Sequence, residues 1–354
     1  MISTFLYLSL CLLSTTSAFI LRNKENIILI PTAAFRDHSK VPSTDWLLYN
    51  KGWYYEENNV QAKILEKSLE LVVKKDLDNN RIKLFTAEGE KNKDLCVDGL
   101  NRSMCTKTDD EGRIKNTFQL TDAELKQFIQ AEGNTAKLFY QASVPNRNIR
   151  ATGEVYVCDD NGVTFISDID DTIKITGVTS NTETLINTFS GEFKAVSGMS
   201  DIYQYWQKQY TATFAYLTAS PDQLYPFLRE FLDRENFPTG SYHMRHFTWL
   251  DKNFISFFMS SDYIKSKTDT IEMFINNTVN RTFVLIGDIF QKDPDIYAGI
   301  YAKYSSRIGK IFIRKYSNDE TGQQRLEQVF KDIPKQKWGT FESGSDLPRD
   351  NFLV

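Results

Sequence analysis

The sequence has no excess of positive charge. Its 42 lysine and arginine residues are outnumbered by 46 aspartate and glutamate residues, which gives a formal net charge of -4 at pH 7. A nucleic-acid-binding protein needs a basic face, and a global attraction to anionic membranes needs a basic total. We therefore expect no nucleic-acid partner, whereas a local basic patch remains compatible with this balance.

Cysteine is scarce, with four residues in a chain of 354. Their spacing does not suggest a zinc site. Cys96 and Cys105 flank a polar loop and could form a disulfide in an oxidising compartment, which would leave Cys158 unpaired. The alternative is that these three cysteines are buried free thiols, and the sequence leaves both interpretations open.

Long apolar runs are absent except at the N-terminus. Residues 1–18 contain a short apolar core followed by small and polar residues up to Ala18. This pattern predicts a secretory signal peptide, although no lysine or arginine precedes the core. The alternative is an uncleaved membrane anchor reaching Leu21, and the serine and threonine residues inside the run argue against it. Three glycosylation sequons fit a secretory route, and they begin at Asn101, Asn276 and Asn280.

The length and the ordinary globular composition predict about two domains. Residues 19–158 contain short apolar runs separated by turns, such as the one at Lys51-Gly52-Trp53. We predict a β-rich, sandwich-like domain interrupted by helices near 61–73 and 122–131. Ile82, Leu84 and Phe85 are predicted to lie near a further strand.

Residues 159–316 alternate apolar strands with amphipathic helices, which indicates a parallel sheet. The predicted strands are Val163–Ser167, Thr213–Leu217, Phe283–Ile286 and Lys310–Arg314. Ser220-Pro221-Asp222-Gln223 is predicted to cap one helix, and Asp293-Pro294 to begin another. Ligands bind beyond the carboxyl ends of the strands in such sheets. Residues 317–354 carry no motif and are predicted to form a tail with one surface helix.

Two aspartates separated by one residue, Asp168 and Asp170, follow the first of these strands. If both are buried, their charges repel and one pKa should rise. A magnesium ion, which prefers carboxylate and carbonyl oxygens, would relieve this repulsion. One carboxylate could then attack phosphorus while the other transfers a proton. For this motif alone, an ordinary acidic loop is the alternative.

The other strand ends supply groups that would complete such a site. Asp288 ends the third strand and Asp293 follows it, while Thr218 offers a hydroxyl after the second. Lys267 precedes the third strand and could hold a transferred phosphoryl oxygen. Lys265 is a nearby rival for that role, and a solvated lysine is the ordinary alternative for either.

This order of residues, Asp-x-Asp-x-Thr, Thr, Lys and Gly-Asp with a further Asp, resembles the four motifs of the haloacid dehalogenase superfamily. The residues around these motifs resemble the catalytic domain of the actin-patch-associated phosphatidate phosphatase family of fungi. The matching stretches are Ile166 to Lys174, Ser197-Gly198-Met199, Ala219-Ser220-Pro221, Leu285 to Asp288 and Gln291 to Tyr297. The resemblance covers roughly residues 153–314 and implies an α/β, haloacid dehalogenase-like catalytic domain with a Rossmannoid parallel sheet. The β-rich half also resembles that family's N-terminal region.

The resemblance implies a Mg²⁺-dependent phosphatase that hydrolyses phosphatidate to diacylglycerol and phosphate at a membrane surface. Asp168 would form an aspartyl phosphate. Asp170 would protonate the leaving alkoxide, then activate water, and its backbone carbonyl would bind the metal. Thr218 and Lys267 would hold phosphoryl oxygens. The implied metal ligands are Asp168, Asp170, Asp288 and Asp293.

Two positions depart from the family pattern. Ile289-Phe290 stand where the family usually has Ser-Gly, which is expected to remove a backbone or hydroxyl contact near the metal. Thr218 stands where the family usually has serine, an exchange of one hydroxyl for another. The first change bears on rate and substrate fit more than on reaction type, because Asp288 and Asp293 are retained.

Other functions fit parts of the sequence. The same fold could act on a soluble phosphomonoester or a phosphoprotein, or could serve as a non-catalytic, secreted binding module. A histidine-dependent phosphatase is not expected, because His38, His243 and His246 lie in no supporting motif. The segment 254–259 is a candidate for lipid contact with a buried strand as its alternative, and Arg245 and Lys252 could meet a lipid phosphate.

Overall fold

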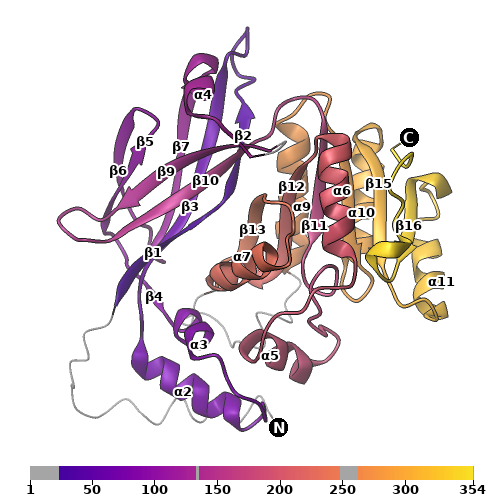
Figure 1. Ribbon diagram of the computed structural model, residues 1–354, viewed down its shortest axis with the longest axis horizontal. Helices are drawn as coiled ribbons and strands as arrows, with labels where there is room; N and C mark the ends of the chain where they lie inside the picture. The colour runs from indigo at the N-terminus through magenta and orange to yellow at the C-terminus, as the bar shows by residue number, and fades with distance from the viewer. Residues whose placement is uncertain (1–23, 133–134, 248–261, 354) are drawn as a thin grey trace.

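The computed structural model describes residues 24–132, 135–247 and 262–353. Figure 1 shows a β-rich half at one side of the molecule and an α/β half at the other. The predicted signal peptide and the segment 254–259 lie outside the described residues. None of the helices within the described ranges is both long enough and apolar enough to span a bilayer.

Within the described residues, ten strands of the β-rich half form one mixed sheet. They are β1 Glu25–Ile30, β2 Thr32–Arg36, β3 Asp45–Glu56, β4 Glu88–Gly89, β5 Asp94–Gly99, β6 Arg102–Lys107, β7 Arg113–Thr121, β8 Gln130–Glu132, β9 Thr135–Ser143 and β10 Arg150–Val157. The order along the sheet is β1-β3-β2-β10-β9-β5-β6, and β7 also pairs with β3. A β-rich half is thus confirmed, but it is one continuous sheet rather than a sandwich of two. The long strand β3 connects the sheet. It pairs with β7 from Asp45 to Trp53, with β2 near its start, and with β1 and β4 near its end.

Three helices interrupt this half: α2 Asn59–Glu70, α3 Asn79–Phe85 and α4 Asp122–Phe128. The Asn58 side chain accepts hydrogen bonds from two backbone N–H groups of α2, and Asp78 does the same for α3. Such caps satisfy backbone donors that the helix itself leaves unpaired. Ile82, Leu84 and Phe85 therefore lie in a helix, and the strand predicted near them was wrong.

The α/β half contains a sheet of six parallel strands within the described residues, in the order β13-β12-β11-β14-β15-β16. The strands are β11 Val163–Asp168, β12 Thr213–Pro221, β13 Ser241–Arg245, β14 Thr282–Asp288, β15 Ile308–Arg314 and β16 Trp338–Phe341. The helices are α5 Asn181–Phe189, α6 Met199–Tyr210, α7 Tyr225–Arg234, α9 Asp262–Asn276, α10 Asp293–Tyr304 and α11 Glu320–Val329. The predicted parallel α/β sheet is confirmed, and all four predicted strands are present.

Helices cover both faces of this sheet, as the near-continuous burial of β11, β12 and β14 requires. Apolar side chains of α6 and α7 pack on one face, and those of α9, α10 and α11 pack on the other. Strands β13 and β16 were not predicted. Segment 317–354, predicted as a tail, instead supplies the edge strand β16 in addition to its helix.

The two halves share a core. Ile28 and Trp53 of the β-rich half pack in one cluster with Phe214 and Tyr242 of the α/β half. The Tyr242 backbone N–H donates to the Pro31 carbonyl at 2.9 Å. The chain passes from one sheet to the other between β10 and β11, close to the predicted boundary at 158/159.

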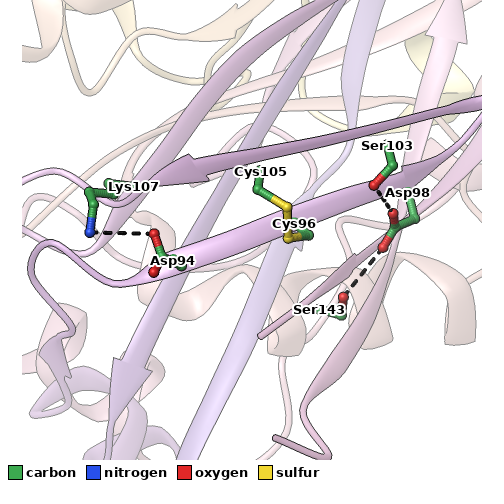
Figure 2. Close-up of a disulfide and its surroundings, with 7 residues drawn as sticks. All are labelled: Asp94, Cys96, Asp98, Ser103, Cys105, Lys107 and Ser143. Atoms are coloured by element: carbon green, nitrogen blue, oxygen red, sulfur yellow. Dashed lines mark hydrogen bonds and ion pairs between the residues drawn. A yellow bond between two sulfur atoms is a disulfide. The ribbon is translucent and has the colours of Figure 1, made fainter. Parts of the chain in front are cut away.

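A disulfide joins neighbouring strands of the β-rich half. Cys96 on β5 lies directly opposite Cys105 on β6, and Figure 2 shows the bond between them. The hydrogen bond from Ser103 to Asp98 and the ion pair between Lys107 and Asp94 flank it on the same two strands. Of the two interpretations that the sequence allowed, the structure has the disulfide. Cys158 is a buried free thiol.

Candidate active site

Three buried aspartates meet at the carboxyl edge of the parallel sheet. Asp168 ends β11, Asp288 ends the neighbouring strand β14, and Asp293 is the first residue of α10. One carboxylate oxygen from each lies within 4.8 Å of the others, and all three residues are at most 1% exposed. The chain turns in opposite directions along the sheet from β11, to β12 on one side and β14 on the other. Open α/β sheets bind ligands at this point.

Lys267 of α9 connects two of these aspartates. Its Nζ lies 2.8 Å from Asp168 Oδ1 and 2.6 Å from Asp293 Oδ1. Burial by itself would lower the pKa of Lys267, but the carboxylates of Asp168 and Asp293 raise it above the usual value, so the side chain stays an ammonium. Lys265, the rival in the sequence, is exposed and pairs with Asp269.

The aspartate cluster brings three buried carboxyl groups together with one ammonium group. Burial raises the pKa of Asp168 to about 8, and Asp293 and Asp170 add to the effect of burial. Burial also raises the pKa of Asp288 well above its ordinary value, with the charges of Asp293 and Asp168 contributing. Among the described residues, Lys267 is the cation that contacts Asp168 and Asp293. A further positive charge would stabilise the ionised cluster.

One carboxylate oxygen of Asp288 indicates where a further cation would bind. Asp288 Oδ1 accepts the backbone N–H groups of Phe290 and Gln291, at 2.5 and 2.9 Å. Asp288 Oδ2 is buried and has no hydrogen-bond partner among the described residues. A buried carboxylate oxygen without a partner is costly. Together with the two other carboxylates, it forms a set of hard oxygen donors that fits Mg²⁺.

The departure from the family pattern at Ile289-Phe290 does not remove the backbone contact near this site. The Phe290 N–H donates to Asp288, and backbone donation does not depend on the side chain. The backbone contact is therefore retained, and the alternative in that expectation, the loss of a hydroxyl contact, stays a prediction. The Ile289 side chain is buried and faces α11, because a Cβ at Gly322 would lie 2.8 Å from Ile289 Cδ1.

Gly287 makes room for Asp293. A Cβ at position 287 would lie 2.4 Å from Asp293 Oδ2 and 2.7 Å from Asp293 Cβ. Any side chain at this position would push the Asp293 carboxylate away from the end of β14. The Gly-Asp pair therefore supplies both a carboxylate, Asp288, and the space for a second one.

The side chain of Asp170 is held by four donors. Its Oδ1 accepts Lys174 Nζ and Thr176 Oγ1, both at 2.8 Å. Its Oδ2 accepts Thr218 Oγ1 and Ser220 Oγ, both at 2.7 Å. Burial alone would raise the pKa of Asp170, but Lys174 and the two hydroxyls outweigh it and hold the pKa below its ordinary value. The Asp170 carboxylate is not part of the three-aspartate cluster.

The loop after β11 holds this arrangement in place. Thr172 Oγ1 donates to Asp168 Oδ2 at 2.8 Å, so both oxygens of Asp168 have a donor. Asp171, with a positive φ of 55°, accepts the backbone N–H groups of residues 176, 177 and 178. Arg314 Nη1 donates to the Asp171 carbonyl at 2.8 Å, which connects the loop to the end of β15.

Sequence reasoning missed Ser220, Lys174 and Thr176. Ser220 was predicted to cap a helix, but β12 continues to Pro221 and a 3-10 turn, Asp222–Leu224, precedes α7. No side-chain cap hydrogen bond is found at Pro221, so that capping prediction was wrong. The signal that was available is the spacing: in a strand, residues i and i+2 point to one face, which places Ser220 beside Thr218.

Of the residues predicted as candidates for lipid contact, only Arg245 lies within the described residues. The Arg245 Nε donates to the Ala219 carbonyl at 2.9 Å, so this arginine lies beside the end of β12. Nearby, His246 Nδ1 lies 2.8 Å from Asp222 Oδ1. Lys252 and the segment 254–259 lie outside the described residues.

Comparison with known proteins gives a family match to the half of the chain that carries this site. Residues 163–315 match the family model for the catalytic domain of phosphatidate phosphatase APP1. A Schizosaccharomyces pombe protein named only as uncharacterized is 33% identical over 189 residues, which cover 51% of this chain and 30% of that protein. Phosphatidate phosphatase APP1 of Saccharomyces cerevisiae is 26% identical over 256 residues, which cover 70% of this chain and 42% of that protein. The chain thus spans less than half the length of either relative.

Among solved structures, a carbohydrate acetylesterase from Xanthomonas citri is 9% identical, with a TM-score of 0.26 and coverage of 70% of both chains. A TM-score this low does not establish a common fold. The family match includes every residue that the sequence proposed for the site: Asp168, Asp170, Thr218, Lys267, Asp288 and Asp293. The resemblance carried by the motifs is confirmed, and residues 163–315 match the catalytic domain family of phosphatidate phosphatase APP1.

Proposed function

We propose that this protein is a Mg²⁺-dependent phosphatase that hydrolyses phosphatidate to diacylglycerol and phosphate. The observation that carries the proposal is the convergence of Asp168, Asp288, Asp293 and Lys267, from four separate elements, at one buried point of the sheet edge. The family match of residues 163–315 adds the reaction class, and the name of the yeast relative adds the substrate.

We also propose that the α/β half has a haloacid dehalogenase-like fold. Numbered from β11, its sheet order is 3-2-1-4-5-6, the order of a doubly wound Rossmannoid sheet. The nucleophile would then stand at the end of the central first strand. Asp168, which ends β11 and has both carboxylate oxygens held by donors, fits that position.

In the proposed reaction, Asp168 attacks phosphorus and the bond from phosphorus to the glyceryl oxygen breaks. Asp170 would first take up a proton, because its pKa rises when Thr218 and Ser220 turn away from it. It would then give that proton to the leaving alkoxide, and later take one from the water that hydrolyses the aspartyl phosphate. Thr218 and Ser220, whose hydroxyls now donate to Asp170 Oδ2, could turn to the phosphoryl oxygens when substrate binds. Lys267 would offset negative charge on the phosphoryl group.

The side chains of Asp168, Asp288 and Asp293 would hold the magnesium ion, with the backbone carbonyl of Asp170 as a further donor. When bound, Mg²⁺ would neutralise negative charge on the reacting phosphoryl group. The orphaned Oδ2 of Asp288 supports this assignment.

The test is phosphate release from a panel of substrates by the purified protein. Phosphatidate and lysophosphatidate in mixed micelles are compared with soluble phosphomonoesters and a phosphopeptide. We expect phosphatidate to be hydrolysed with the highest kcat/KM. Preference for a soluble ester would keep the phosphatase assignment and overturn the lipid substrate. No release from any substrate in the presence of Mg²⁺ would instead favour a binding module.

We further propose that the protein enters the secretory pathway through a signal peptide at residues 1–18. The cross-strand disulfide supports an oxidising compartment. The three sequon asparagines, Asn101, Asn276 and Asn280, are all exposed and accessible to glycosylation. We expect a mature chain that begins near Phe19 and loses mass on glycosidase treatment, as measured by N-terminal sequencing and intact mass. An unglycosylated chain that still begins at Met1 would contradict this.

A further inference from the structure

Helix α2 has a buried face and an opposite face turned to solvent. Ala62, Leu65 and Leu69 pack against α3 and α5. On the other side, Val60 and Leu71 are 70% and 74% exposed. An α-helix turns about 100° per residue, so Val60, Lys67 and Leu71 fall close to one line along its surface. Ile64 and Lys63 lie on either side of that line, and we call these five residues the α2 outer face.

Helix α2 and the five residues after it carry more lysines than acidic residues. Residues 59–75 contain four lysines and two glutamates, in a chain whose net charge is -4, and Asp76 and Asp78 follow before α3 begins. Lys63 and Lys67 are exposed on the α2 outer face, and Lys74 and Lys75 are exposed just after the helix. The two glutamates lie toward the flank of that face. A helix that shows both lysines and apolar side chains to solvent is complementary to an anionic lipid surface.

The α2 outer face belongs to the end of the molecule that carries the candidate active site. Figure 1 shows all three helices α2, α3 and α5 at the lower end of the view, with α2 and α3 below β4 of the β-rich half and α5 below the strands of the α/β half. Side chains of all three helices form one cluster with Phe247. Helix α3 also contacts the turn that follows β12, the strand that carries Thr218 and Ser220.

Other exposed apolar side chains lie at the same sheet edge. Ile175, which is 47% exposed, directly follows Lys174 in the loop after β11. Tyr316 is 50% exposed, comes two residues after β15 ends, and its ring lies 5.3 Å from that of Phe290. An exposed apolar group gains free energy when a lipid interface covers it.

We propose that the α2 outer face docks the protein on an anionic phospholipid surface, with the lysines contacting headgroups and Val60 and Leu71 entering the interface. The role of this docking in catalysis rests on the proposed function, because docking here would bring the candidate active site close to a lipid substrate. The binding itself requires no turnover and can be measured separately.

The test is flotation of the full chain with vesicles of phosphatidylcholine alone or mixed with phosphatidylglycerol. Phosphatidylglycerol is anionic but is a phosphodiester, so the proposed monoesterase would not consume it. We expect binding to the mixed vesicles, weakened by salt, and little binding to the neutral ones. Lys63→Glu with Lys67→Glu should weaken binding at least about thirty-fold, because each lost lysine contributes about 1 kcal/mol near an anionic surface and each glutamate is also repelled by it. Val60→Ser with Leu71→Ser should weaken it as well.

The matched control is Lys126→Glu with Lys331→Glu, which makes the same charge change at two exposed lysines away from α2. This control should retain most of the binding. Val41→Ser, at a 98% exposed valine in the loop between β2 and β3, is the apolar control. Circular dichroism melting curves show whether each variant is folded. Equal loss in the test and control pairs, or unchanged binding of a folded test pair, would overturn the proposal.

Two further outcomes separate this inference from the proposed function. If the protein binds anionic vesicles through this face but releases no phosphate from any substrate, the docking surface stands and the phosphatase assignment fails. If the protein hydrolyses phosphatidate while the folded test pair binds vesicles normally, the phosphatase assignment stands and the docking surface fails. Concentration-dependent self-association that the same substitutions abolish, without vesicle binding, would assign the face to a protein partner and overturn the proposal.

Discussion

Replacement of Asp168 by Asn is expected to reduce phosphate release at least about a thousandfold, equivalent to about 4 kcal/mol of lost transition-state stabilisation. A neutral amide is a far weaker nucleophile than a carboxylate, and it cannot form a hydrolysable aspartyl phosphate. The fold should survive, because the amide has nearly the shape of the carboxylate. The measurement is kcat/KM on the best substrate of the panel, with a melting curve for each protein.

The control for Asp168→Asn is Asp295→Asn. Asp295 also lies at this edge, in the first turn of α10, but it is 46% exposed and pairs with Arg325 outside the aspartate cluster. Its loss of charge should change kcat/KM by no more than about twofold, since surface ion pairs contribute little. Phosphate release by Asp168→Asn at the rate of the Asp295→Asn control would contradict the covalent mechanism.

Removal of divalent metal is expected to reduce activity at least about a hundredfold, and added Mg²⁺ should restore it. The physical reason is the charge of the buried cluster, where Asp168, Asp288 and Asp293 converge and Lys267 is the cation held between two of them. Without a second cation, the phosphate of a substrate would add more negative charge to the same place. Activity is measured after chelation and dialysis, and again after Mg²⁺ is returned.

Metal binding can also be followed without turnover. Titration calorimetry should detect Mg²⁺ binding, and Mg²⁺ should raise the melting temperature, because a ligand of the native state stabilises it. Asp288→Asn is the informative variant: its side-chain oxygen can still accept the N–H groups of Phe290 and Gln291, but the charged Oδ2 is lost. This variant should bind Mg²⁺ at least about tenfold more weakly. Full activity of metal-free protein would rule out the proposed metal site.

Elements with local signals could be predicted from the sequence alone. Buried strands of a parallel sheet are runs of apolar residues, so Val163–Ser167 and Phe283–Ile286 could be predicted from their own composition. The carboxyl ends of parallel strands share one edge, which predicted that Asp168, Asp288 and Asp293 would lie close together. The helix at Asp293-Pro294 was also predictable, because proline fits the first turn of a helix.

Other features were not local, and the sequence pattern failed there. Strand β13 lies in a segment for which no strand was predicted, and β16 lies in one predicted as a tail. Both are edge strands and short, so their apolar pattern is weak, and pairing with β12 and β15 defines them. Likewise, the long strand β3 joins a predicted sandwich into one sheet, because it finds different partners along its length.

The contacts of the polar groups in the site depend on how distant segments pack together. Lys265 and Lys267 are both lysines and lie two positions apart in the sequence. Lys265 is exposed, whereas Lys267 is buried between Asp168 and Asp293. Ser220 has the local pattern of a helix cap, yet its hydroxyl donates to Asp170. A hydroxyl or an ammonium group forms its hydrogen bonds with whichever acceptors lie near it in the folded protein. Here the donor and the acceptor are about fifty to a hundred residues apart in the sequence. Local sequence therefore specified which chemical groups reach the sheet edge, and packing specified which of them touch.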